Sequence, residues 1–121
     1  MKRHIILIAI ITALLSVAVV QAYAAEKTIG VIMTGDIPYY KAIHKAFLAG
    51  LSEHGFGPGK VNVVLQTPAP EAMSWTNAAR KLIAIDADVI VAYGAPATLA
   101  VVHESSAIPI VFAGVYDPQG V

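Results

Sequence analysis

The segment from Asp88 to Thr98 limits most strongly the folds that this chain can adopt. Its run Val89–Tyr93 is apolar on both faces, which is typical of a central parallel strand covered by helices on each side. Gly94 then permits a tight turn, and Pro96 suits the start of a helix because it has no amide hydrogen to leave unpaired. The segment therefore predicts a strand, a turn and a helix of an α/β protein.

The rest of the chain alternates in the same way. Short β-rich runs predict further strands over residues 28–33, 60–67 and 108–113. Apolar residues at helical spacing predict helices over 39–54 and 96–105, and another that carries Trp75 and Leu82 on its apolar face. Strands that alternate with amphipathic helices form a parallel sheet with helices on both faces. The last strand leads into a loop without a covering helix, so we expect an incomplete sheet.

The first residues predict a secretory signal peptide. Lys2, Arg3 and His4 precede an apolar run over residues 5–20, and Ala22-Tyr23-Ala24 supplies the small residues of a cleavage site ahead of Ala25. An uncleaved membrane anchor is the alternative, but the run is shorter than the roughly 20 residues that span a bilayer. We therefore expect a signal peptide over 1–24, a mature domain over 25–121 and a location in the periplasm.

The composition excludes several classes of function. Removal of Lys2 and Arg3 with the leader leaves six basic against eight acidic residues, so no basic patch indicates a nucleic-acid partner. The absence of cysteine excludes disulfides and thiolate metal sites. The sequence has no GxSxG elbow, and its histidines, expected at the surface, lack metal-ligand spacing. We expect no catalytic residue, no metal and no cofactor. Asp86 and Asp88 precede a strand and are expected as solvated loop charges.

The loops that follow the strands are the candidate ligand site, because ligands of open parallel sheets bind beyond the carboxyl ends of the strands. These loops cover residues 34–40, 66–67, 94–98 and 114–118 and carry hydroxyls, small residues and aromatic rings. Such a set suits a small molecule held by hydrogen bonds and ring contacts. For the tyrosines, ligand contact and simple partial burial stay equally open, whereas Trp75 on its apolar stripe is expected in the core.

Three segments of the chain resemble a known family. They are residues 27–32 (KTIGVI), residues 46–56 (AFLAGLSEHGF) and, most specifically, residues 109–118 (PIVFAGVYDP). Together with the leader, they resemble ABC transporter substrate-binding proteins with the type I periplasmic binding protein fold, in which each lobe is flavodoxin-like. The similar branch includes binders of aromatic amino acids.

The resemblance implies two α/β lobes that close on a small-molecule ligand and deliver it to an ABC permease in the cytoplasmic membrane. This chain ends at Val121, so it resembles the N-terminal part of such a protein. The alternative is the extracytoplasmic sensing module of a signalling protein. In the first lobe, Thr98 and neighbouring amides are expected to hold the polar end of the ligand and a tyrosine to cover it. The implied ligand contacts are Thr34, Asp36, Tyr39, Gly94, Ala95, Pro96, Ala97, Thr98, Tyr116 and Asp117.

Overall fold

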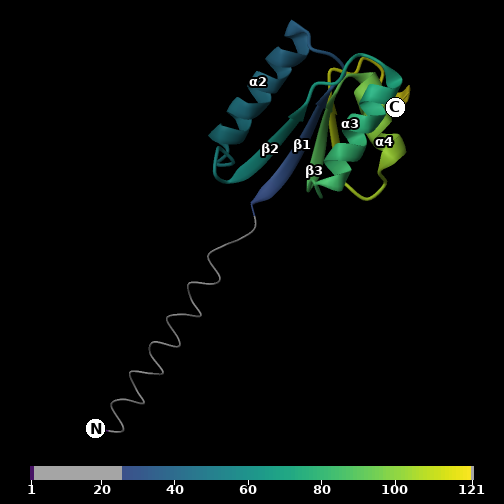
Figure 1. Ribbon diagram of the computed structural model, residues 1–121. Helices are drawn as coiled ribbons and strands as arrows, with labels where there is room; N and C mark the ends of the chain where they lie inside the picture. The colour runs from purple at the N-terminus through teal and green to yellow at the C-terminus, as the bar shows by residue number, and fades with distance from the viewer. Residues whose placement is uncertain (2–25, 121) are drawn as a thin grey trace.

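The computed structural model describes Met1 and residues 26–120. Within residues 26–120, the parallel strands β1 (Lys27–Met33), β2 (Val61–Gln66), β3 (Val89–Tyr93) and β4 (Ile110–Ala113) form one sheet in the order β2-β1-β3-β4 (Figure 1). Helices α2 (Pro38–Glu53), α3 (Ala72–Ala84) and α4 (Ala95–Glu104) connect the strands, and a 3-10 helix η1 (Pro118–Gly120) follows β4. The predicted α/β class is confirmed. The predicted signal peptide and its cleavage site lie outside residues 26–120.

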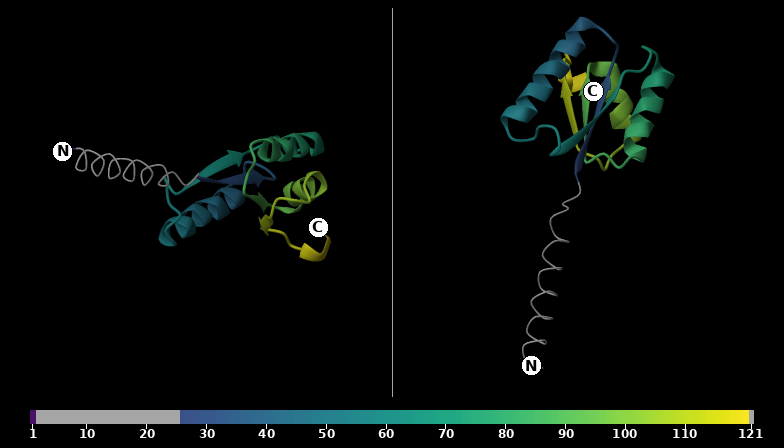
Figure 2. Two further views of the ribbon diagram at one scale, coloured as in Figure 1. Left: turned by 90° about the horizontal axis from the view of Figure 1, so that it is seen from below. Right: turned by 60° about the vertical axis from the view of Figure 1, so that its left-hand side comes forward.

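The helices cover both faces of the sheet, as the apolar strands predict. Figure 2 shows α2 on one side and α3 with α4 on the other. Because successive side chains of a strand point to opposite faces, Val31 packs toward α2 and Ile32 toward α3 and α4, and both are fully buried. β1 and β3 are the two inner strands, and in β1 Val31 lies opposite Leu65 of β2 and Val91 of β3.

The two apolar clusters differ in how closely their helices approach. Leu82 of α3 packs onto β1 at Gly30, where an added Cβ would lie 3.1 Å from the Leu82 methyl carbons. On the other face, α2 reaches the sheet through the longer side chains of Ile43, Phe47 and Leu51. A small residue in β1 therefore allows close packing on the face of α3.

Helix α2 ends in a turn that directs the chain into β2. Gly55 adopts a φ of 84°, its N–H donates to the carbonyl of Ser52 at 3.1 Å, and the N–H of Phe56 donates to the carbonyl of Leu51 at 2.8 Å. This pair of bonds is the Schellman arrangement, in which glycine provides the left-handed residue after the helix. The end of α2 agrees with the helix predicted over residues 39–54.

The strand β4 forms one edge of the sheet and is the least covered of the strands. Val111 is 54% exposed and Phe112 is 43% exposed, whereas Ile110 packs against the cluster beneath α4. The expectation that the last strand lacks cover therefore holds for Val111 and Phe112.

Candidate functional site

The loops after β1, β3 and β4 meet at one edge of the sheet, which lies at the top of Figure 1. Backbone hydrogen bonds hold them together. The N–H of Thr34 donates to the carbonyl of Tyr93 at 3.0 Å, and the N–H of Gly94 donates to the carbonyl of Ala113 at 2.9 Å. We call this edge, with residues 34–40, 94–98 and 114–118, the rim.

A hollow of about 420 Å³ opens at the rim between the start of α4 and the segment after β4. Its volume lies within the range of about 300–1,000 Å³ that is usual for small-molecule sites. Four residues of the predicted site line it together with four others: Ala95, Pro96, Tyr116 and Asp117 from the prediction, and Tyr40, Leu99, Gly114 and Gly120 in addition.

Gly94 lies where side chains from two elements approach the backbone. Its φ is 89°, and an added Cβ would lie 2.6 Å from Oγ1 of Thr34 and would also clash with the hydroxyl of Tyr40. This φ, combined with a ψ of 156°, is a conformation essentially restricted to glycine, and the close approach of the two side chains favours glycine as well. The glycine thus lets Thr34 and Tyr40 pack directly against the turn that precedes α4.

Thr34 joins three elements of the rim. Besides the bond from its own N–H to Tyr93, its Oγ1 accepts the N–H of Ala97 at 3.2 Å, and its carbonyl accepts the indole N–H of Trp75 at 2.8 Å. The structure therefore gives this predicted ligand contact a structural role between the β1–α2 loop, α3 and α4. Direct contact of Thr34 with a ligand stays a prediction.

The start of α4 offers fewer open donors than its sequence indicates. Thr98 is 1% exposed, its hydroxyl donates to the carbonyl of Gly94 at 2.8 Å, and its N–H donates to the same oxygen at 3.1 Å. Pro96 has no N–H, and the N–H of Ala97 is bonded to Thr34. In the first turn of α4, the N–H of Ala95 therefore has no hydrogen-bond acceptor among residues 26–120. Ligand contact through the Thr98 hydroxyl stays a prediction.

Asp36 and Tyr39 flank the hollow without lining it. Asp36 pairs with Lys41 at 2.9 Å and lines a separate hollow of about 270 Å³ between α2 and the ends of β1 and β2, which Met33 and Leu65 also line. Tyr39 is 48% exposed and packs edge-on against Tyr40, with ring centroids 5.2 Å apart. Tyr40, which the predicted set omits, is the tyrosine of α2 that lines the hollow. The helical spacing of Tyr40, Ile43 and Phe47 is the signal that places it toward the sheet.

A polar contact lies beneath the rim, where the sequence predicts only a surface histidine. His44 is half-buried against Tyr93, with its Nδ1 3.0 Å from the phenol oxygen. Burial raises the pKa of Tyr93 to about 12 and lowers the pKa of His44. The expectation for His44 is therefore wrong, because its turn of α2 faces the end of β3. A neutral imidazole is expected to accept the phenol hydrogen.

Asp88 also does more than its predicted role as a solvated charge. It is exposed, but its carboxylate accepts the N–H of Thr28 at 2.8 Å and pairs with Lys27 at 3.0 Å. These two contacts, the backbone bond first, lower the pKa of Asp88. They fasten the start of β1 to the start of β3, at the edge opposite the rim.

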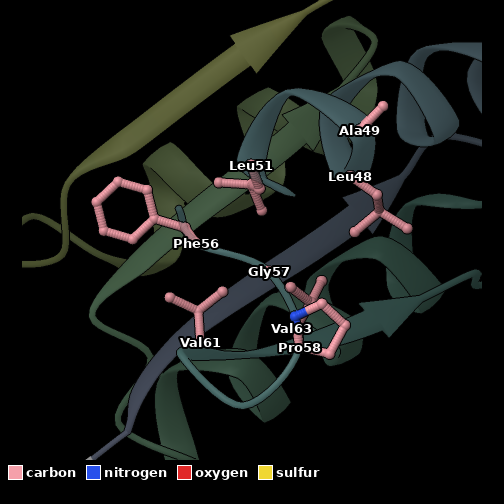
Figure 3. Close-up of a pocket in the computed structure, with 8 residues that line it drawn as sticks. All are labelled: Leu48, Ala49, Leu51, Phe56, Gly57, Pro58, Val61 and Val63. Atoms are coloured by element: carbon pink, nitrogen blue, oxygen red, sulfur yellow. The ribbon is translucent and has the colours of Figure 1, made fainter. Parts of the chain in front are cut away.

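Two other cavities are weaker candidates for a ligand site. Figure 3 shows one of about 450 Å³ between α2 and β2, lined by apolar residues that include Leu48 and Phe56. Small-molecule sites use a few polar groups to fix orientation, and this lining supplies no polar side chain. The other, of about 440 Å³, is open and polar and lies beside Gln66 and Thr67 after β2. Neither brings together loops from several strands.

Residues 26–120 contain no group of three or more histidine, cysteine, aspartate or glutamate side chains that could hold a metal ion. None of the helices in this range is long and apolar enough to cross a membrane.

Comparisons with known proteins show which family and which solved structures this chain is similar to. The family described as ABC transporter substrate binding protein matches residues 7–121. Among curated proteins, none matches the chain significantly. A ligand-free, open structure of a substrate binding protein with adhesive properties from Clostridium difficile is 25% identical, with a TM-score of 0.74 over 78% of this chain and 32% of that one. A conserved domain protein from Vibrio cholerae is 27% identical, with a TM-score of 0.77 over 79% of this chain and 33% of that one.

An ABC domain in complex with L-Trp from Streptococcus pneumonia shares the fold, with 23% identity and a TM-score of 0.76 over 79% of this chain and 32% of that one. The chain thus spans about a third of the length of these solved structures. The α/β sheet matches a lobe of such proteins. Because the family match covers nearly all of the sequence, the chain belongs to the ABC transporter substrate-binding protein family.

Proposed function

We propose that the chain forms the first lobe of an extracytoplasmic solute-binding protein that delivers a small molecule to the permease of an ABC importer. The observation that carries the proposal is the hollow at the rim, which gathers residues from the start of α2, the start of α4 and the segment after β4. A two-lobed protein closes on its ligand, so this hollow supplies one side of the site. The location in the periplasm rests on the predicted leader, and export is expected to leave Ala25 as the first residue. The intact mass of the exported protein tests this cleavage.

The ligand contacts of this lobe are proposed to come from the predicted residues together with Tyr40. The N–H of Ala95 is the donor for an anionic or carbonyl oxygen, because the other first-turn amides of α4 already have acceptors or lack a hydrogen. The carboxylate of Asp117, which also lines the hollow and accepts the N–H of Gln119 at 3.2 Å, suits a cationic group. Tyr116 is 96% exposed and is free to cover a ligand with its ring.

A donor and a carboxylate that line one hollow suit a zwitterion, and the aromatic rings that line it suit an apolar side chain. The proposed ligand class is therefore an amino acid with an apolar or aromatic side chain. The L-Trp in the Streptococcus pneumonia structure belongs to that protein, and it supplies the first probe to use here.

Nuclear magnetic resonance of the ¹⁵N-labelled chain tests the proposal, because it detects the weak binding that one lobe is expected to give. Titration with L-tryptophan, L-leucine and L-glutamate at millimolar concentration should shift the amide signals of residues 94–98 and 116–117, least with L-glutamate. Tyr116→Ala and Asp117→Asn should reduce the shifts. The matched control is Phe56→Ala, which removes an exposed ring at the apolar cavity away from the rim. Shifts confined to residues outside the rim, or no shifts with any amino acid, would contradict the proposal.

A further inference from the structure

Trp75 is the single tryptophan of the chain and bonds to the rim from a helix that does not line the hollow. It lies on α3 and is only half-buried, outside the two core clusters, whereas its apolar stripe predicts a place in the core. Its indole N–H donates to the carbonyl of Thr34 at 2.8 Å. A buried indole N–H usually has an acceptor, and here that acceptor is a backbone carbonyl of the rim.

The bond from Trp75 helps to fix Thr34, which is hydrogen-bonded to several elements of the rim. The N–H of Thr34 is bonded to β3, its hydroxyl to the N–H of Ala97 in α4, and its carbonyl to Trp75. The carbonyl and the N–H belong to the two peptide units that flank the Cα of Thr34. Because both units are held, the backbone angles of Thr34 are fixed, and with them the direction in which its side chain leaves the backbone.

The direction of the Thr34 hydroxyl decides which donor of α4 stays open. While Oγ1 accepts from Ala97, that amide cannot bind a ligand, and the N–H of Ala95 is the donor left at the hollow. If Thr34 turned away, the N–H of Ala97 would lose its acceptor, and the start of α4 would present a different set of donors.

We propose that Trp75 is a positioning residue of the rim, which holds Thr34 on the N–H of Ala97 and so keeps the ligand-binding donors in one arrangement before the ligand arrives. Trp75 acts through Thr34 and does not itself touch the ligand. The part of this proposal that concerns ligands rests on the proposed function, whereas the effect on Thr34 and Ala97 does not.

Amide hydrogen exchange on the purified chain tests the positioning role. Trp75→Phe keeps an aromatic ring and removes the N–H, and it should speed the exchange of the Ala97 amide about five- to tenfold, which is the effect of losing one hydrogen bond. The matched control is Ile83→Val, which trims a partly buried side chain on the same helix without touching Thr34. If the two variants lower the global stability similarly, Ile83→Val should leave the Ala97 amide protected. Equal acceleration of Ala97 exchange in both variants would overturn the proposal.

A double-mutant comparison sharpens the test. Thr34→Val removes the hydroxyl acceptor and retains the carbonyl, so Ala97 exchange should already be fast in this variant. Adding Trp75→Phe should then change it by less than about twofold, because coupled groups are not additive. A full further acceleration in the double variant would show that Trp75 acts on α4 by another route.

The ligand part is measured separately with L-tryptophan as the probe. If the unmodified chain gives rim shifts with L-tryptophan, Trp75→Phe should weaken that binding about five- to tenfold and Ile83→Val should not. Equal affinity in the unmodified chain and in Trp75→Phe would overturn the effect on ligands. If the unmodified chain binds no amino acid, the proposed function fails, and the exchange data still decide the role of Trp75 at Thr34.

Discussion

Replacement of Gly94 by alanine is expected to destabilise the protein strongly, although it adds only one methyl group. Alanine at this position must hold a φ of 89° with a ψ of 156°, a conformation that is essentially restricted to glycine and costs another residue about 1–3 kcal/mol. The new Cβ would lie 2.6 Å from Oγ1 of Thr34 and would clash with the hydroxyl of Tyr40. Overpacking of this kind costs about 1–3 kcal/mol, so the free energy of unfolding should fall by about 2–6 kcal/mol.

Two other glycines separate these effects. Gly59→Ala meets a φ of 84° with no atom within 4 Å of the added Cβ, so it should cost only the backbone strain of about 1–2 kcal/mol. Gly50→Ala lies inside α2 with no atom within 4 Å, and it should stabilise the protein by about 0.5–1 kcal/mol. Urea and thermal denaturation followed by circular dichroism measure all three. For a domain of this size, Gly94→Ala should lower the Tm by roughly 10 °C or more. A Gly94→Ala loss no larger than that of Gly59→Ala would refute the close approach of Thr34 and Tyr40 to the turn.

Three further predictions concern side chains beneath or opposite the rim. Burial lowers the pKa of His44 below 6.5, so the unfolded chain takes up a proton at a higher pH than the folded chain does. The free energy of unfolding should therefore fall as the pH drops through 6.5. Urea denaturation between about pH 5 and 8 measures this dependence, which His44→Gln should flatten. The N–H of Thr28 and the ammonium group of Lys27 lower the pKa of Asp88. Its contribution to stability is therefore present above about pH 4 and is lost as the pH falls through the pKa of the folded state. In Asp88→Asn, the free energy of unfolding should depend less on pH in this acidic range. Thr98→Val keeps the side-chain shape and removes the bond to the Gly94 carbonyl, which should cost about 0.5–1.5 kcal/mol in urea denaturation, whereas the exposed Ser106→Ala should change stability little.

Local patterns were enough to predict the elements of the fold. The apolar run Val89–Tyr93 is a buried central strand because its neighbours and helices cover both faces, and the glycine at 55 ends α2 because it can adopt the left-handed conformation. The meeting of the loops at one edge followed from parallel strands alone. These features depend on residues close in sequence or on rules that hold for every parallel sheet.

The hydrogen-bond partners at the rim could not be predicted in the same way. Thr34 bonds to Trp75 and Ala97, which are 41 and 63 residues away, and His44 bonds to Tyr93, 49 residues away. Such pairs depend on how far each helix is rotated against the sheet. The same rotation decides that Tyr40 lines the hollow while the adjacent Tyr39 flanks it, because neighbours on a helix point about 100° apart.

The inner position of β1 has a consequence for the speed and order of folding. β1 is made first, yet its partners are β2, which begins at Val61, and β3, which begins at Val89. The strand therefore cannot complete its pairing until about sixty further residues have followed it, and closing such long loops before any contact is gained slows folding. A chain built in this order is expected to pair its strands late in synthesis. Such a delay would suit the proposed export, in which the chain crosses the membrane before it folds.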